Sequence, residues 1–493
     1  MQSVIGIDIG TTNTKAVAFT REGKVIAVAN AGYSAFSPEE GNHELAPSEI
    51  LNAVVNVLKK ILEATKPFSE INGISFSCAM HSLMAVDKEG VPLTNIITWA
   101  DLRSSAEAAK LKGSDAGNRI YEQCGTPLHA MTPLCKILWL KNNKPEIFYI
   151  THKFIGIKEY LWHEFFGKYQ VDYSIASATG MFDIYKYVWN NEALDYAGIS
   201  SDKLSEPVEP EHTETILSEK YNNEFALNAG MPFIIGSSDG CLANLGSNAV
   251  RDGETSLTIG TSGAIRMASS QPKYDPKERI FNYILKKDLY ISGGAMNNGG
   301  SVIQWYMHHF LSRSSLTEKE ISVLMEAVND VDAGSEGLIF LPYIFGERAP
   351  IWNENAKGVF FGISSRHQQK HFLRSIVEGI SFSLYQIGVS LEETLGPIKK
   401  IYASGGFIQS KAWLQIIADV FNKEVMVLNI SDASAIGAAM LGMKSVGLIN
   451  SFDEVAKFFE IQEFFFPDVG RNKTYRQSVK KFASLYALLK EEF

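Results

Sequence analysis

One aspartate in the sequence lies where an acid–base reaction could take place. Asp239 follows the apolar run at residues 233–235 and has the small neighbours Ser237, Ser238 and Gly240, which leave room beside its carboxylate. A carboxylate near its ordinary pKa can accept a proton from an alcohol within hydrogen-bond distance. Asp-Gly pairs are equally common in plain turns. From these residues alone, Asp239 is either a turn residue or a general base.

Two Gly-Thr turns follow apolar strands and are suited to binding phosphate. One lies in IDIGTTNTK at residues 7–15, and the other in LTIGTSG at residues 257–263. Glycine lets a ligand approach the backbone, consecutive N–H groups can point at an anion, and hydroxyl groups add donors. Lys15 could add a positive charge, and Asp8 could hold Mg²⁺ through water. For either turn alone, a β-hairpin is the structural alternative.

Two Gly-Gly pairs precede expected helices. Gly299 and Gly300 lie in NNGGSVIQW, and Gly405 and Gly406 lie between a strand and a helix in ASGGFIQSKAWLQII. Such pairs let a flat ligand reach the backbone near a helix N-terminus, or they allow close helix–strand packing. No GxxxxGK[ST] motif occurs, and no GxGxxG motif follows the first strand, which disfavours P-loop and Rossmann nucleotide sites.

Composition excludes several classes of protein. The 493 residues carry a net charge of −9 with both signs spread along the chain, unlike a protein that binds a nucleic-acid backbone. The first residues form a strand pattern, and no apolar run of about 18 residues occurs, so we expect a cytoplasmic protein without a membrane partner. The 4 cysteines are widely spaced and predict neither disulfides nor a zinc site.

The order of predicted elements indicates an α/β fold. Residues 4–30 read as three strands joined by turns, residues 47–64 show helical spacing with Ser48 as the expected N-cap, and residues 71–77 form a strand. Because the second Gly-Thr turn repeats the first near the middle of the chain, we expect a duplication. The charged, aromatic tail at residues 451–493 is expected to be helical and to pack on the second domain.

Several longer patterns together resemble the FGGY carbohydrate kinases of the actin, Hsp70 and sugar-kinase superfamily. DIGTTNTK resembles the first phosphate loop of that family, TIGTSGA the second, and SGGF its adenosine loop. Residues 131–143 and 358–378, the latter ending at Glu378, fit the two long family patterns, and the resemblance extends from residue 4 to about residue 445. It implies two duplicated ribonuclease H-like α/β domains with an interdomain cleft. The expected N-terminal domain, residues 1–247, holds the sugar, the first phosphate loop and the catalytic aspartate, and residues 248–493 bind ATP.

The resemblance also assigns roles to individual residues, with ATP and Mg²⁺ as cofactors. It implies Asp239 as the catalytic base, with Asp8 and Asp239 near the metal. It implies substrate contacts from Met80, His81, Trp99, Asp101, Arg103 and Gly240. It implies nucleotide contacts from Gly10, Thr11, Thr12, Asn13, Lys15, Gly260, Thr261, Ser262, Gly300, Gln304, Gly405, Gly406 and Ser410. Glycerol kinases have Asn in place of Ser410 and Arg in place of Lys15, and a lysine supplies charge without the forked geometry of arginine.

Within the family, CAMHSLMAVD at residues 78–87 and ITWADLRS at residues 97–104 resemble the gluconate kinase branch. Ala79, Ser82 and Ala100 replace the Gln, Gly and Asn that are usual in xylulose kinases. The implied reaction is phosphorylation of the gluconate C6 hydroxyl. Two cations are candidates for the substrate carboxylate, Arg103 and Arg348. The alternatives are a kinase for another sugar or polyol, such as xylulose, and a non-catalytic ATP-dependent binding protein. Relatives are often dimers, so a homodimer is also expected.

Some of these residues also have purely structural interpretations. His81 could be a satisfied core histidine, and Asp101 could lie in the first turn of a helix. Lys136 and Trp139 lie on a helix whose apolar neighbours suggest a buried face, and Glu378 could brace its helix rather than react.

Overall fold

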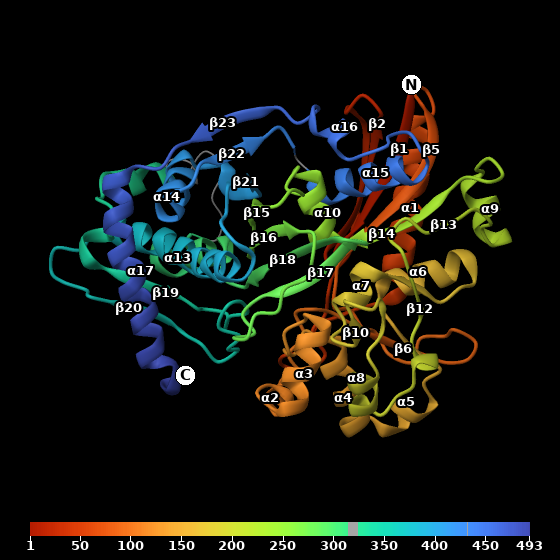
Figure 1. Cartoon of the computed structure of the whole chain (residues 1–493), viewed down its shortest axis with the longest axis horizontal. Helices are drawn as coiled ribbons and strands as arrows, with labels where there is room; N and C mark the ends of the chain where they lie inside the picture. The colour runs from red at the N-terminus through yellow and green to blue at the C-terminus, as the bar shows by residue number, and fades with distance from the viewer. Residues whose placement is uncertain (314–323, 431) are drawn as a thin grey trace.

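The chain forms two α/β halves, each built on one mixed sheet. The computed structural model describes residues 1–313, 324–430 and 432–493. In Figure 1 the N-terminal strands lie at the upper right, and the second sheet with its helices lies to the left. The five central strands of one sheet, β14-β5-β1-β2-β3, follow the same pattern as β22-β21-β15-β16-β18 of the other. The predicted duplicated α/β fold is therefore confirmed.

The first sheet begins with the predicted hairpins. β1 pairs antiparallel with β2, β2 pairs antiparallel with β3, and β5 and β14 continue the sheet in parallel. Its strands are β1 (Gln2–Ile9), β2 (Asn13–Thr20), β3 (Val25–Gly32), β5 (Glu70–Cys78), β13 (Thr213–Glu214) and β14 (Phe233–Ser238). The β1–β2 turn contains the first Gly-Thr sequence, so the hairpin and the expected phosphate loop are the same element.

The second sheet repeats this arrangement with the other Gly-Thr turn between β15 and β16. Its strands are β15 (Glu254–Ile259), β16 (Gly263–Ser269), β17 (Phe281–Lys286), β18 (Leu289–Met296), β21 (Lys400–Ser404), β22 (Val425–Leu428) and β23 (Ile461–Phe465). The edge strand β23 lies in the tail that was expected to be helical. That part of the prediction is wrong, because this short segment, with its β-branched Ile461 and adjacent Phe464 and Phe465, pairs antiparallel with β22.

Helix α1 (Pro47–Thr65) packs on β2 and β3 and confirms the predicted amphipathic helix. Its first residue matches the expected range, but its N-cap lies two residues before Ser48. Ala46 occupies the N-cap position without a side-chain hydrogen bond, and Pro47 is the first helical residue. Ser48 is therefore not the cap, and the proline, whose backbone angle suits the first turn, sets the start of the helix.

A lobe between β5 and β14 lies mostly in the lower part of Figure 1, while its last helix, α9 (Glu219–Phe225), lies at the right near β13. Its helices are α2 (Ser105–Leu111), α3 (Asp115–Cys124), α4 (Pro133–Asn143), α5 (Pro145–Ile150), α6 (Ile157–Phe166), α7 (Tyr173–Ser177), α8 (Asn191–Ala197) and α9 (Glu219–Phe225). The short strands of the lobe, together with β4, which precedes it in the chain, are β4 (Glu44–Leu45), β6 (Met84–Val86), β7 (Ile96–Ile97), β8 (Lys153–Ile155), β9 (Gln170–Asp172), β10 (Phe182–Asp183), β11 (Val188–Trp189) and β12 (Glu206–Val208).

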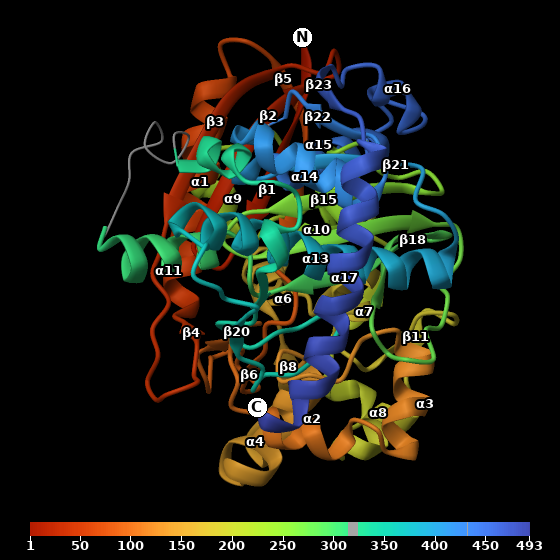
Figure 2. The same ribbon diagram turned by 90° about the vertical axis from the view of Figure 1, so that its left-hand side faces the viewer.

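The second half has its own apolar core. Its elements outside the sheet include α11 (Gly300–Leu311), β19 (Ile339–Pro342), β20 (Gly358–Phe361), α13 (Gln369–Leu395), α14 (Lys411–Phe421), α16 (Asp453–Ala456) and α17 (Val469–Leu489). Figure 2 shows α17 along the outer side of this half, where it packs on α14 and α13. Tyr475 and Phe482 of α17 are buried there, as expected for the tail. No helix in the described ranges is long and apolar enough to cross a membrane.

The two halves meet where α10 (Asp239–Gly246) crosses α15 (Ala433–Ser445). α15 comes late in the chain but packs against β1 and β5 of the first sheet. A Cβ on Gly246 would lie 1.9 Å from the Ala433 carbonyl oxygen, and one on Gly437 would lie 2.0 Å from the Leu242 carbonyl oxygen. Backbone therefore touches backbone at this crossing, and glycine is required there.

Gly437→Ala should lower the melting temperature, because its added methyl group must push the two helices apart. Overpacking of this kind costs about 1–3 kcal/mol. Helix propensity alone would favour alanine by about 1 kcal/mol, so a loss of stability isolates the packing effect. Thermal unfolding of Gly470→Ala is the control, because this helical position is exposed and the nearest atom to an added Cβ is Asp468 Oδ1 at 3.2 Å rather than backbone. Equal or higher stability of Gly437→Ala would contradict the close crossing.

Candidate active site

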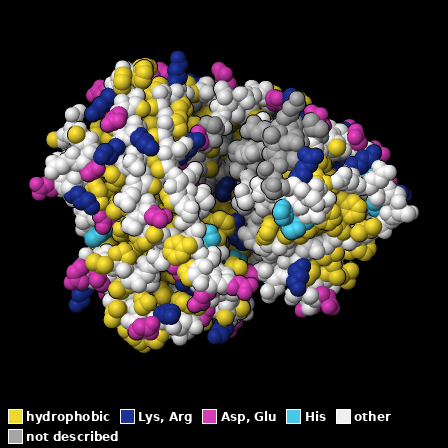
Figure 3. Space-filling view, turned by 180° about the vertical axis from the view of Figure 1, so that it is seen from behind, with side chains coloured by type: hydrophobic (Ala, Val, Ile, Leu, Met, Phe, Trp, Pro, Cys, Tyr) yellow, Lys and Arg dark blue, Asp and Glu magenta, His cyan; other side chains and the backbone are white. Residues whose placement is uncertain are grey.

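A cavity of about 370 Å³ lies between the two halves and receives residues from both sheets. Figure 3 shows the molecule hollowed between its halves, with basic side-chain atoms visible inside. The lining residues that the sequence singled out are Gly10, Thr11, Thr12, Met80, His81, Trp99, Asp239, Gly260, Ser262 and Arg348. The structure thus brings both Gly-Thr turns, the Met-His pair, Trp99 and Asp239 to one place.

The two Gly-Thr turns have related backbone geometry. The Gly10 N–H donates to the Asn13 carbonyl at 2.9 Å, and the Gly260 N–H donates to the Ser262 carbonyl at 2.9 Å. Each turn is thereby closed by its own backbone, which leaves the hydroxyl groups at its tip available to a ligand. Two such turns lining one cavity could hold the two sides of a polyphosphate.

The start of α11 is attached directly to the second turn. The Gly300 N–H donates to the Gly260 carbonyl at 2.7 Å, and a Cβ on Gly300 would lie 2.7 Å from that oxygen. Gly405 has a φ of +94° and lies against the Ile259 backbone. Both glycines therefore permit close approach of chain segments around the second turn, just outside the cavity. Gln304 is exposed on α11, and Gly406 is exposed beside Gly405.

Two polar residues predicted to contact the nucleotide already have partners within the chain. Lys15 forms an ion pair with Asp432. The Ser410 hydroxyl accepts a hydrogen bond from the Trp413 N–H at 3.2 Å and caps α14. The Ser410 side chain thus contributes to the start of the helix, which leaves the neighbouring backbone as the surface offered to a ligand.

Asp239 is the first residue of α10, directly after β14. Its Oδ1 accepts the Gly240 N–H at 2.6 Å. Burial raises the pKa of Asp239, while the positive charge of Arg266 acts in the opposite direction. Gly240 does not line the cavity, but a Cβ there would lie 3.1 Å from Arg266 Nε and 3.1 Å from Met80 Cε. The carboxylate therefore lies at the cavity wall with a cation nearby.

Asp8 lies near Asp239 at the end of β1. The Ser77 hydroxyl donates to its Oδ1 at 2.7 Å, and burial together with the negative charge of Asp239 raises the pKa of Asp8 to about 7. The described residues contain no group of three or more His, Cys, Asp or Glu side chains arranged as metal ligands. One or two carboxylates are nevertheless sufficient for Mg²⁺ that also binds phosphate oxygens.

His81 is part of the cavity wall, yet both of its ring nitrogens have protein partners. Its Nδ1 donates to the Ala178 carbonyl at 2.8 Å, and the Tyr283 hydroxyl lies 3.2 Å from its Nε2. Burial and the positive charge of Lys136 lower its pKa to about 3, so the ring is neutral. His81 can therefore shape the cavity by contact, and Met80 beside it provides an apolar surface.

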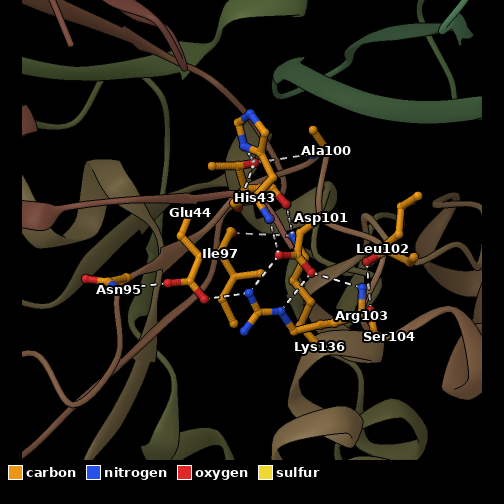
Figure 4. Close-up of polar contacts among 12 residues, drawn as sticks. His43, Glu44, Asn95, Ile97, Ala100, Asp101, Leu102, Arg103, Ser104 and Lys136 are labelled. Atoms are coloured by element: carbon orange, nitrogen blue, oxygen red, sulfur yellow. Dashed lines mark hydrogen bonds and ion pairs between the residues drawn. The ribbon is translucent and has the colours of Figure 1, made fainter. Parts of the chain in front are cut away.

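Asp101 and Arg103, which were predicted to contact the substrate, do not line this cavity. Figure 4 shows the Asp101 carboxylate between His43 and Arg103 and the Arg103 guanidinium directed at Glu44. Asp101 accepts the His43 N–H at 2.7 Å and Arg103 Nε at 2.8 Å, and Arg103 Nη2 pairs with Glu44 at 2.5 Å. Arg103 faces a separate hollow of about 570 Å³ that contains neither Asp239 nor a Gly-Thr turn. Its charge is paired there with Glu44 and Asp101.

Arg348, the other candidate cation, lines the same cavity as Asp239. Its guanidinium lies 4.7 Å from the centre of the Trp99 ring, and its Nε donates to Asn297 Oδ1 at 2.8 Å. Burial lowers its pKa to about 10, so it remains charged near neutral pH. Among the hydrogen bonds of the described residues, Nη1 of Arg348 has no partner, which leaves an edge for a ligand carboxylate.

Comparison with known proteins decides the family. The model for the N-terminal domain of the FGGY family of carbohydrate kinases matches residues 3–246, and the model for the C-terminal domain matches residues 255–446. The chain belongs to the FGGY family of carbohydrate kinases. Its fold is the two-domain fold of this family, and its activity is phosphoryl transfer to a carbohydrate.

Relatives of the kinase include enzymes of two substrate types. A gluconokinase from Bacillus licheniformis is 42% identical over 99% of this chain and 96% of the relative. The crystal structure of gluconate kinase from Lactobacillus acidophilus has a TM-score of 0.93 at 33% identity, covering 99% of this chain and 98% of that one. The ligand-bound xylulose kinase from the same organism has a TM-score of 0.94 at 33% identity, covering 99% of both chains.

Several residues of the kinase cavity were missed at the sequence level. Arg266, Tyr283, Met131 and Trp352 also line it. Arg266 alone carried a usable signal, because it is the one charged residue in the otherwise apolar strand β16. Its Nε is buried without a hydrogen-bond partner among the described residues. Tyr283, Met131 and Trp352 resemble ordinary core residues, and only the fold shows that they face the cleft.

Glu378, the last residue of the second family pattern, braces the kinase fold away from this cavity. Its carboxylate accepts the Gly334 N–H at 2.9 Å and the Ser335 hydroxyl at 2.8 Å, and it pairs with Arg374 Nε at 2.8 Å. All three partners lie in the second half. The structural interpretation of Glu378 therefore fits its contacts.

Proposed function

We propose that this kinase transfers the γ-phosphoryl group of ATP to the C6 hydroxyl of gluconate, with Asp239 as the general base. The observation that favours a sugar acid over a neutral sugar as the acceptor is Arg348, a buried and oriented cation in the same cavity as Asp239. Relatives named gluconokinase over nearly the whole chain support the same choice.

The acceptor would bind between Arg348 and Asp239. Its C1 carboxylate would pair with the Arg348 guanidinium, and its hydroxylated chain would lie against Met80, His81 and Trp99. The C6 hydroxyl would then point at Asp239. Burial raises the pKa of Asp239, and the positive charges of Arg266 and, to a smaller extent, Lys158 and Arg348 oppose that rise.

ATP would place its phosphates between the turns at residues 10–12 and 260–262, with its adenosine near Gly300 and Gly405. Asp8 and Asp239 fit a divalent cation, because the negative charge of Asp239 already raises the pKa of Asp8. Mg²⁺ bound with the nucleotide would supply positive charge against the phosphate oxygens.

In the proposed step, the oxygen of the C6 hydroxyl attacks the γ-phosphorus, the bond to the β-phosphate oxygen breaks, and ADP leaves. Asp239 takes the hydroxyl proton, which becomes acidic late in a loose transition state. Positioning and charge supply most of the acceleration. Closure of the two halves over both substrates would exclude water and limit hydrolysis of ATP.

An acceptor panel tests the proposed function directly. Purified kinase should consume ATP with gluconate at a kcat/KM above those for xylulose, glycerol, ribulose and fuculose. Preference for xylulose would replace the acceptor but keep the reaction. ATP consumption that no acceptor stimulates would contradict both the gluconate and the xylulose interpretation.

Asp239→Asn should lower kcat by about 10²–10⁴, the usual contribution of a general base, with little change in KM for the acceptor. The amide has the shape of the carboxylate but cannot accept the proton. Circular dichroism and the melting temperature verify that the variant is folded. Turnover close to that of the wild type would show that Asp239 is not the base.

Arg348→Met should lower kcat/KM for gluconate roughly ten- to a hundredfold, because a charge-assisted hydrogen bond contributes about 1.5–3 kcal/mol. The kcat/KM of Arg348→Lys for gluconate should lie between that of the wild type and that of Arg348→Met. The lysine keeps the charge but lacks the forked geometry of the guanidinium. Arg374→Met, which removes a buried arginine bonded to Glu378 and Tyr475 far from the cavity, controls for lost stability. An equal loss with a neutral sugar would argue against carboxylate recognition.

A further inference from the structure

One buried lysine is attached to both loops of the acceptor wall. Lys136 lies on α4, is 0% exposed, and its Nζ donates to the His81 carbonyl at 2.6 Å and the Thr98 carbonyl at 2.7 Å. A longer contact of 3.4 Å reaches the Ile97 carbonyl. An ammonium group has three N–H donors, so the three carbonyls match its full capacity.

These carbonyls belong to the backbone that carries the cavity residues. His81 lines the cavity itself, and Thr98 directly precedes Trp99. The His81 backbone has a φ of +65°, a left-handed conformation that is unfavourable for a residue with a side chain and must be held by its surroundings. The lysine amine is thus a bridge between the loop after β5 and the loop after β7.

Burying the Lys136 amine costs desolvation free energy that an apolar side chain of similar size would avoid. In the described part of the chain no carboxylate lies within ion-pair distance of Lys136 Nζ, and burial lowers its pKa to about 7. A methionine would fill similar space without desolvating a charge, but it would leave the His81, Ile97 and Thr98 carbonyls without this donor. Unlike an apolar side chain, the amine forms hydrogen bonds that fix the positions of the His81 and Thr98 carbonyls relative to each other.

A second residue of α4 supports the same loop. Trp139, one turn after Lys136, lies 5.1 Å from the Arg103 guanidinium, and Arg103 holds Asp101 in the arrangement of Figure 4. Met131, just before α4, lines the cavity. Residues three apart share a helix face, so α4 presents Lys136 and Trp139 together to residues 97–103.

We infer that Lys136 is a positioning residue for the acceptor, and that its ammonium group sets the spacing between His81 and Trp99 without touching the substrate. Trp99 in turn underlies Arg348. Lys136 thereby fixes the position of the His81 and Trp99 loops relative to Arg348, the proposed carboxylate site. The identity of the acceptor rests on the proposed function, whereas the positioning role concerns whichever acceptor the kinase uses.

The test is Lys136→Met, assayed with the acceptor that the wild type uses best in the panel. KM for that acceptor should rise about tenfold or more, with KM for ATP changed less than about twofold, because the hydrogen bonds of Lys136 reach the acceptor wall and neither Gly-Thr turn. Lys136→Gln, which retains an amide donor, should recover part of the acceptor affinity. If the panel selects a sugar other than gluconate, the proposed function fails. The change in KM for the preferred acceptor relative to the change in KM for ATP still tests the positioning role.

Arg374→Met is the matched control, since it removes another buried cation bonded to a backbone carbonyl but lies away from the acceptor wall. It should lower the melting temperature without changing KM for the acceptor. A Lys136→Met variant that loses stability but keeps both KM values would overturn the positioning role. Failure of both the Met and Gln variants to fold would overturn it equally, in favour of a purely structural lysine.

Discussion

Contact between the backbones of α10 and α15 determines where the reacting groups lie. Gly246 and Gly437 leave no space for a methyl group at this crossing, so the distance between the two helices is fixed. α10 starts with Asp239 at the cleft, and α15 follows Asp432, which is the ion-pair partner of Lys15 on the strand after the first Gly-Thr turn. The crossing therefore holds the proposed base against the first Gly-Thr turn. Phosphoryl transfer depends on such placement, since the protein contributes mainly position and charge.

The cleft also collects charged groups whose burial is unfavourable. Burial raises the pKa of Asp8 and Asp239 and lowers the pKa of Arg266 and Arg348. Each shift reports a charged form that has lost water without gaining a full set of partners. A ligand that carries positive charge to the acids and negative charge to the arginines would relieve both penalties. A metal–nucleotide together with a sugar acid has this distribution of charge, whereas a neutral ligand meets only part of it.

The sequence predicted elements whose determinants are neighbours in the chain. Both strand–turn–strand units, α1 and the helix start at Gly300 followed from local patterns. The direction of side chains in residues 97–103 could not be predicted in this way. Trp99 faces the cavity, but Arg103 turns toward Glu44, which lies 59 residues away in sequence, so its orientation depends on tertiary contact. Arg266 and Tyr283 reach the cavity because β16 and β17 lie beside α10, and no motif marks them.

Selectivity between a sugar acid and a neutral sugar depends on which buried polar groups of the protein each ligand would leave without a hydrogen-bond partner. The kinase matches solved gluconate and xylulose kinases almost equally well, so the course of the backbone does not distinguish the two acceptors. A neutral sugar could fill the cavity but would bury the Arg348 guanidinium without an acceptor for its remaining edge. A site built around a buried polar group rejects a ligand lacking the complement more strongly than a hydrophobic pocket rejects a small change in shape. Trp99 lies against that guanidinium, and Lys136 is hydrogen-bonded to the backbone just before Trp99. The proposed discrimination between acceptors would therefore depend on Trp99 and Lys136 as well as on the charge of Arg348.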